Sequence, residues 1–146
     1  MRILPALLAS LALLGCALPR WPVEAPLTSP YGVRFRGLSP DMHKGVDLAA
    51  PLGTPVLAMK RGTVEFAGEM RGYGLVVMLR HGRNVRTVYA HLSQISVKKG
   101  DAVEGRQTLG LSGQSGDATG PHLHFEVQRW GHEEDPVQLL GGIPGR

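Results

Sequence analysis

The sequence predicts an all-β domain, built as an antiparallel β sandwich or a partly open barrel. Glycine and proline are plentiful, with 20 and 11 of the 146 residues, whereas aromatic residues make up only 5%. This balance favours short strands joined by tight turns. No stretch keeps the 3.6-residue apolar period of a helix, and the 42% of hydrophobic residues is enough for one core. The length suits a single domain.

The expected strands are short runs of aliphatic and β-branched residues, and each is bounded by turn residues. Arg61-Gly62 and the run His81-Gly82-Arg83-Asn84 are examples of such turns. Closely spaced strands with tight connections pair in an antiparallel manner. We expect strands over residues 56–59, 64–67, 75–80, 85–91, 102–103 and 122–128.

The N-terminus has the pattern of an export signal. Arg2 is followed by the apolar run 3–14, which is shorter than the roughly 20 residues that cross a bilayer. A charged start, a short apolar run and a small residue at its end predict a signal peptide over residues 1–15. The run ends in Leu-Leu-Gly before Cys16 and resembles the lipobox of bacterial lipoproteins, in which the cysteine is lipidated. An ordinary signal peptide with an incidental cysteine is the alternative.

The residues after this signal predict where the protein resides. Cys16 is the only cysteine, and lipidation would explain a lone thiol in an exported protein. Residues 16–26 contain three prolines and are predicted to form a short tether, with the domain over residues 27–146. By resemblance to lipoproteins, Ala17 after the cysteine favours an anchor in the outer membrane, facing the periplasm.

The charge of the chain is compatible with an anionic partner without identifying one. The formal net charge is +4 and the isoelectric point is about 9.6. The arginines are scattered and lack interleaved aromatic residues, so we do not expect a nucleic-acid partner.

Five histidine and aspartate residues form the candidate site. His43 and Asp47 are four residues apart, and His122 and His124 are two apart, so in extended chain the members of each pair share a face. His91 ends an expected strand, on the face of Thr87 and Tyr89. Each pair alone is common by chance.

Together these residues have the composition of a catalytic zinc site. Since residues 17–146 contain no cysteine, any metal there must be held by His, Asp or Glu. Three such ligands leave a coordination position for water, whose pKa zinc lowers to about 7. Amide hydrolysis further needs a proton acceptor and a donor, which neighbouring histidines can supply.

Several motifs, in order and in spacing, are similar to those of the lysostaphin/LytM-type zinc metallopeptidases, which cleave peptidoglycan peptides. The likeness covers residues 27–140. Its motifs are residues 28–34, 43–48, 51–56, 72–74, 89–93 and 113–126. The resemblance implies a fold of the duplicated hybrid motif type, with an open groove over one Zn²⁺ per chain.

The resemblance also implies the role of each site residue. His43, Asp47 and His124 match the family's metal ligands, and His91 and His122 match its catalytic histidines. The division of these two between base and oxyanion stabiliser stays open. The implied activity is hydrolysis of peptide cross-links in peptidoglycan by a metal-activated water, with D,D-endopeptidase specificity in a cell with diaminopimelate cross-links.

Two alternatives to an enzyme remain at this point. Some members of the family have lost their ligands and regulate cell-wall amidases, and a wall-binding module with structural zinc is also conceivable. The chain shows no inhibitory segment, so a regulatory protein partner is a further expectation.

The remaining polar residues carry weaker expectations. Arg34 could contact the substrate or form a structural ion pair. Glu126 could orient a histidine or lie at a surface position of its strand. His81 and His132 are expected in solvent.

Overall fold

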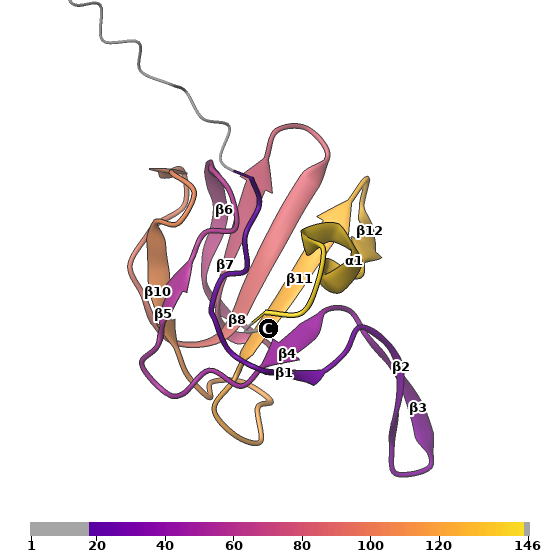
Figure 1. Cartoon of the computed structure of the whole chain (residues 1–146). Helices are drawn as coiled ribbons and strands as arrows, with labels where there is room; N and C mark the ends of the chain where they lie inside the picture. Colours follow the sequence, from indigo (N-terminus) through magenta and orange to yellow (C-terminus); the bar gives the residue numbers. More distant parts are fainter. Residues whose placement is uncertain (1–17, 145–146) are drawn as a thin grey trace, which may run out of the picture.

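The computed structural model describes residues 18–144, which fold into one β-rich domain (Figure 1). Among these residues there are twelve strands and one short helix, and no helix is long and apolar enough to cross a membrane. The elements are β1 (Leu27–Ser29), β2 (Gly32–Arg36), β3 (Ser39–His43), β4 (Val46–Leu48), β5 (Pro55–Leu57), β6 (Gly62–Met70), β7 (Gly74–His81), β8 (Val85–Ile95), β9 (Ala102–Val103), β10 (Thr108–Ser112), β11 (Leu123–Arg129), β12 (His132–Glu134) and α1 (Pro136–Leu140).

Ten strands form one antiparallel sheet, which confirms the all-β prediction. The order along it is β1-β4-β11-β8-β7-β6-β9, and β10 pairs with both β5 and β8, while β12 pairs with β11. All six expected strands exist; β9 has the expected bounds, and the other five have shifted ends. Six further strands, β1 to β4, β10 and β12, were not expected, because they are short or carry polar residues.

The core lies on one face of the central strands β8 and β11. Leu123, Phe125 and Val127 alternate along β11 and are fully buried. Tyr89 of β8 packs against Phe125, with ring centroids 5.3 Å apart. The opposite face of the same two strands is therefore left for other side chains, and it includes His124 and Glu126.

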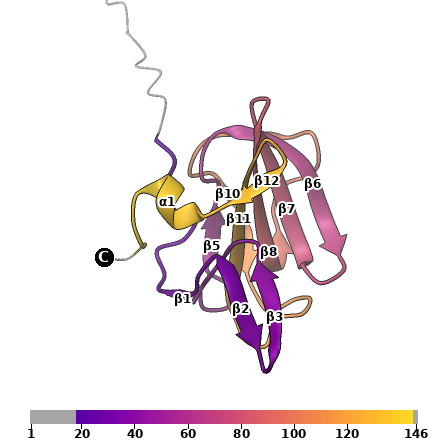
Figure 2. The ribbon, with the colours of Figure 1, turned by 90° about the vertical axis from the view of Figure 1, so that its right-hand side faces the viewer.

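The second sheet is the hairpin β2–β3, which projects from the domain beside β4 and β11 (Figure 2). Its register pairs Arg34 with Asp41 and Gly32 with His43. The hairpin ends at His43, so its base delivers one histidine to the edge of the main sheet.

The predicted tether over residues 16–26 is wrong for its second half. Trp21, Val23 and Ala25 are buried in the core, with 8%, 3% and 5% exposure. The Trp21 indole N–H donates to the carbonyl of Gly142 at 3.1 Å, and its ring meets the edge of Phe125. Proline content suggested an extended tether, but the apolar residues between the prolines are packed against the domain. The signal peptide and Cys16 lie outside the described residues.

Replacing Trp21 by alanine is expected to lower the free energy of unfolding by about 3–5 kcal/mol, because it empties a large core position. Urea denaturation of the variant measures this loss. Leu18→Ala is the control, since Leu18 is 77% exposed and should change stability by less than ~0.5 kcal/mol. Equal stability of the two variants would mean that the Trp21 segment is not part of the core.

Candidate metal centre

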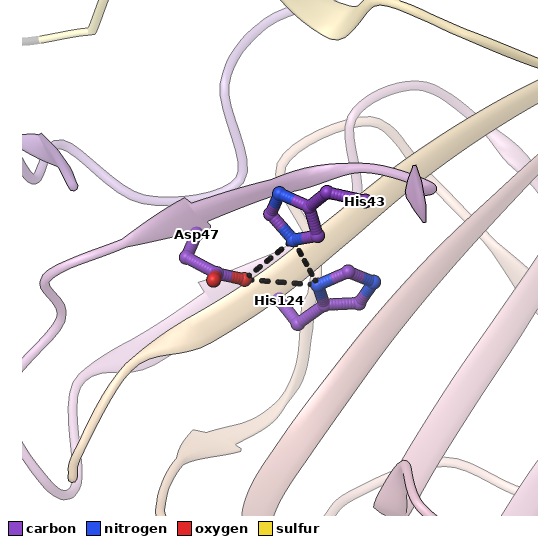
Figure 3. Close-up of side chains that lie close together, drawn as sticks. All are labelled: His43, Asp47 and His124. Atoms are coloured by element: carbon purple, nitrogen blue, oxygen red, sulfur yellow. Dashed lines mark hydrogen bonds and ion pairs between the residues drawn. The ribbon is translucent and has the colours of Figure 1, made fainter. Parts of the chain in front are cut away.

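Three side chains from three strands converge at one point (Figure 3). His43 Nε2 lies 3.1 Å from Asp47 Oδ1 and 3.2 Å from His124 Nδ1. Asp47 Oδ1 and His124 Nδ1 are 2.9 Å apart. The structure thus brings together the three residues expected to bind metal.

The pairing of strands explains this convergence. Asp47 of β4 stands directly opposite His124 of β11. His43 ends β3, and the chain turns through Lys44 and Gly45 before β4 begins. A Cβ atom on Gly45 would lie 2.2 Å from the carbonyl oxygen of Phe125, so only glycine permits this close passage over β11. His43 and Asp47 therefore meet because the chain turns between them. The expectation that both lie on one face of a continuous extended segment is wrong.

Hydrogen bonds on the far side of each ring orient the two imidazoles. His43 Nδ1 donates to the carbonyl of Pro30 at 2.7 Å, which leaves Nε2 as the unprotonated nitrogen. His124 Nε2 donates to Glu126 Oε1 at 2.9 Å, which leaves Nδ1 free. In these tautomers two nitrogen lone pairs and a carboxylate oxygen face one another.

This arrangement fits a zinc ion. All three atoms are acceptors, so only a cation between them satisfies all of them at once. Bonds of about 2.0–2.1 Å in a tetrahedron separate neighbouring ligand atoms by roughly 3.3 Å, close to the 2.9–3.2 Å found here. Zn²⁺ at this point would be held by His43, Asp47 and His124, with its fourth position open.

Arg34 supports the carboxylate ligand from the hairpin. Its Nη1 lies 3.5 Å from Asp47 Oδ2, and its Nε donates to Asp41 at 3.1 Å. Burial alone would raise the pKa of Asp47, but hydrogen bonds and charge from His124 and His43 hold it well below the usual range. The structural interpretation of Arg34 is the one that the geometry supports.

Glu126 orients His124, and the expectation of a surface position is wrong. The side chain is fully buried, and its Oε1 also accepts from the Tyr73 hydroxyl at 2.7 Å. Burial would raise the pKa of Glu126, but the hydrogen bonds from His124 and Tyr73 lower it. In the sequence, the position of Glu126 two residues after His124 indicated that the two side chains share a face. The burial of that face of β11 decided for the orienting role over a surface position.

Replacing Glu126 by alanine is expected to weaken zinc binding by about 10–100-fold, because the His124 ring loses the partner that fixes its tautomer. Titration against a zinc chelator measures the affinity. Glu126→Gln is the matched control: its amide oxygen can still accept from His124, so most of the affinity should remain. Unchanged affinity in Glu126→Ala would exclude this role.

The two remaining histidines, His91 and His122, lie beside the candidate metal centre, and each ring is held by a hydrogen bond from Nδ1 to a backbone carbonyl. His91 Nδ1 donates to the carbonyl of Ser115 and His122 Nδ1 to that of Gly120, each at 2.8 Å. Their rings are 4.7 Å apart between centroids, and His122 Nε2 lies 3.7 Å from Asp47 Oδ1. Each ring therefore has an Nε2 without a hydrogen bond beside the candidate metal ligands. Burial lowers the pKa of His91, so its ring is neutral at pH 7.

His91 reaches this site through a bulge in β8. Leu75 pairs with Leu92 and Val77 with Tyr89, so β8 has one extra residue there, and His91 has a φ of 61°. The bulge reverses the alternation of side chains. The expected face of Thr87, Tyr89 and His91 is consequently wrong: Tyr89 lies in the core with its hydroxyl accepting from the Met59 N–H, and burial raises its pKa to about 12.

The other two histidines lie apart from the metal centre. His132 is exposed, as expected. His81 is half buried, and its two nitrogens bond the Arg61 carbonyl and the Thr87 hydroxyl, each at 2.8 Å. The expectation of a solvated His81 is therefore wrong.

The five site residues line an open groove of about 570 Å³. Its walls come from hairpin β2–β3, the β6–β7 turn and the segment before β11. The lining includes Arg34, Arg36, Asp41, Met42, Lys44, Gly72, Tyr73, Asp117, Thr119 and Glu126. An extended chain can lie along such a groove, over the metal position.

The domain thus belongs to the class of β-rich metallohydrolases, defined by a His-Asp-His group at the floor of a groove. The model of peptidase family M23 matches residues 41–136, and the chain belongs to this family. Its members are zinc metallopeptidases, as the donor set here indicates.

Individual relatives agree with this assignment. The chain is 43% identical over 124 residues to the DD-carboxypeptidase/endopeptidase Mpg of Neisseria meningitidis, covering 84% of this chain and 29% of that protein. It is 46% identical over 85 residues to the peptidoglycan DD-endopeptidase ShyA of Vibrio cholerae (58% and 20%). It is 34% identical over 121 residues to the lipoprotein YgeR of Escherichia coli (82% and 46%). The chain therefore spans less than half the length of these curated relatives.

Solved structures share the fold. The catalytic domain of lysostaphin from Staphylococcus simulans superposes with a TM-score of 0.75 at 35% identity, covering 81% of this chain and 93% of that domain. A zinc-containing peptidase from Vibrio cholerae gives a TM-score of 0.72 at 32% identity, covering 80% and 39%.

Proposed function

We propose that this protein is an exported zinc endopeptidase that hydrolyses peptide cross-links of peptidoglycan, with D,D specificity. The observation that carries the proposal is the convergence of His43, Asp47 and His124 beside two further histidines with unbonded nitrogens. The names of the relatives as a DD-carboxypeptidase/endopeptidase and a peptidoglycan DD-endopeptidase support the substrate.

In this proposal His43, Asp47 and His124 bind the zinc, and His91 and His122 are catalytic. Zinc at this position supplies a water of lowered pKa and polarises the scissile carbonyl. One histidine Nε2 takes the water's proton as its oxygen attacks the carbonyl carbon. The other histidine, once its Nε2 also carries a proton, donates a hydrogen bond from that nitrogen to the developing oxyanion. The proton then passes to the leaving amine, and the peptide bond breaks without a covalent enzyme intermediate.

The backbone contacts of these two histidines suit both roles. Because each Nδ1–H is held by a carbonyl, the ring keeps one orientation during the reaction. A ring that is neutral accepts a proton, and a ring that has become protonated donates one. The two roles are therefore chemically equivalent in this geometry.

The proposed location is a bacterial membrane, through a lipid on Cys16, with the domain in the periplasm. The sequence around Cys16 and the similarity to lipoprotein YgeR support an anchor. The short reach of chain before Trp21 would confine cutting to wall near the anchor.

Incubation of the purified protein with isolated sacculi tests the activity. We expect release of muropeptides with cleaved D-Ala–diaminopimelate cross-links, loss of release with a zinc chelator and recovery on adding Zn²⁺. Release of peptides that are free of glycan but still cross-linked would indicate amidase activity. If sacculi stay intact but an added amidase becomes faster, the protein is a non-enzymatic activator and the proposal is wrong.

A further inference from the structure

Basic side chains gather at the end of the domain where the described chain begins. Hydrogen bonds and pairing hold four segments together there, residues 18–20, 58–65, 80–86 and 98–106. The contacts are Arg20 N to Met59 O, His81 Nδ1 to Arg61 O, Val64 N to Asp101 O and Arg106 N to Ala58 O, at 2.8–3.1 Å, and pairing of Thr63 with Arg80. We call this surface the basic end.

The basic end carries most of the positive charge of the molecule. Seven of its arginines and lysines are exposed: Arg20, Arg61, Arg80, Arg83, Lys98, Lys99 and Arg106. With Lys60 and Arg86 there are nine cations, and against them stand only Glu65, Asp101 and Glu104. The excess of six exceeds the net charge of +4 of the whole chain, so the remainder is net negative.

An exposed indole lies at the same end. Trp130, in the β11–β12 turn, is 70% exposed, and its backbone N–H donates to the carbonyl of Asn84. Its ring borders a hollow of about 330 Å³ together with Arg80, Arg83 and Arg86. Tryptophan beside basic side chains is the composition that lies at the headgroup level of membranes.

The active-site groove opens at the opposite end. Strand β6 begins at Gly62 in the basic end and ends at the turn of Gly72 and Tyr73, which line the groove. Its nine residues span about 30 Å at ~3.3 Å per residue. In Figures 1 and 2 the indigo start of the coloured chain lies in the upper part of the domain, and the hairpin β2–β3 lies at the bottom.

We infer that the basic end docks on an anionic phospholipid surface and so directs the groove away from the membrane, toward the wall. Cys16 precedes Trp21 by five residues, a reach of at most about 18 Å. A lipid on Cys16 would hold this end, and no other, against the headgroups. For the anchor the inference rests on the proposed function, whereas the charge and the indole are independent of it.

The test uses the full lipidated chain on phosphatidylcholine vesicles with or without phosphatidylglycerol. Retention of the protein at high salt reports the anchor. Quenching of Trp130 by brominated lipid reports docking, with Trp130→Phe identifying the signal, since Trp21 is buried. We expect quenching with phosphatidylglycerol only, and its loss at high salt, where charge interactions are screened.

Two charge reversals in exposed turns form a matched pair, Arg83→Glu at the basic end and Arg71→Glu at the groove end. Arg83→Glu should weaken binding to the anionic vesicles on the order of tenfold, because each basic side chain near an anionic surface contributes about 1 kcal/mol. Arg71→Glu should leave it unchanged, and both should still release muropeptides.

Quenching that is equal without phosphatidylglycerol, or equally reduced by both variants, overturns the inference. The inference is also overturned if the protein is retained on the vesicles but Trp130 is not quenched. This includes the result that Arg83→Glu weakens binding to sacculi and has no effect on vesicles. Quenching without retention would keep the inference and reject the anchor.

Discussion

Replacing His43 or His124 by alanine is expected to abolish zinc retention and peptidoglycan hydrolysis together. Each variant leaves two protein ligands for an ion that these sites bind with three. Since the ion contributes several kcal/mol to the transition state, and about 1.4 kcal/mol corresponds to a factor of ten, activity should fall by roughly a thousandfold or more. Metal analysis of the purified variants and muropeptide release measure the two effects.

His132→Ala is the control for this pair of variants, because His132 is exposed and takes no part in the metal centre. It should retain one zinc and full activity. A His124→Ala protein that still held one zinc and cut sacculi would remove His124 from the ligand set. Thermal unfolding of the metal-free proteins separates loss of metal from loss of fold.

Replacing His91 or His122 by alanine should instead separate zinc binding from turnover. Neither residue belongs to the three-residue metal group, so about one zinc per chain should remain. Removal of a group that transfers a proton, or that binds the oxyanion, costs about 10²–10⁴-fold in rate. The measurement is the rate of cross-link cleavage at saturating substrate, with bound zinc determined on the same sample.

Three results would contradict the assigned roles. Full activity in either variant would exclude that histidine from catalysis. Loss of zinc in His91→Ala would mean that the residue stabilises the metal centre, although its Nδ1 is bonded to Ser115. A fall in substrate affinity with an unchanged maximal rate would assign it to binding only.

Much of the metal centre could be predicted from local sequence, because short spacings limit the geometry. Two residues on a strand that are two apart share a face, so the positions of His122 and His124 followed from alternation. The all-β class followed from dense turns between short apolar runs. By contrast, β1, β3 and β4 are short, with polar residues such as Asp41 and Asp47, and no local pattern marks them as strands.

Two features depended on contacts that local patterns do not contain. Burial of Glu126 depends on Tyr73, which is 53 residues away. The burial of Trp21 depends on Phe125 and on Gly142. The prolines beside Trp21 predicted a tether, but they could not indicate whether this part of the chain packs on the domain.

The sequence by itself determined the class of fold, because short apolar runs between dense turns are enough for this, and its motifs predicted the five residues of the site through their resemblance to a known family. Only the tertiary structure decided which atoms face the metal position and how His91 reaches it. A one-residue bulge in β8 reverses every later side chain, and its presence depends on pairing with β7. Tautomers are likewise set by carbonyls and a carboxylate brought in by the fold, so the orientation of each imidazole is a property of the folded domain.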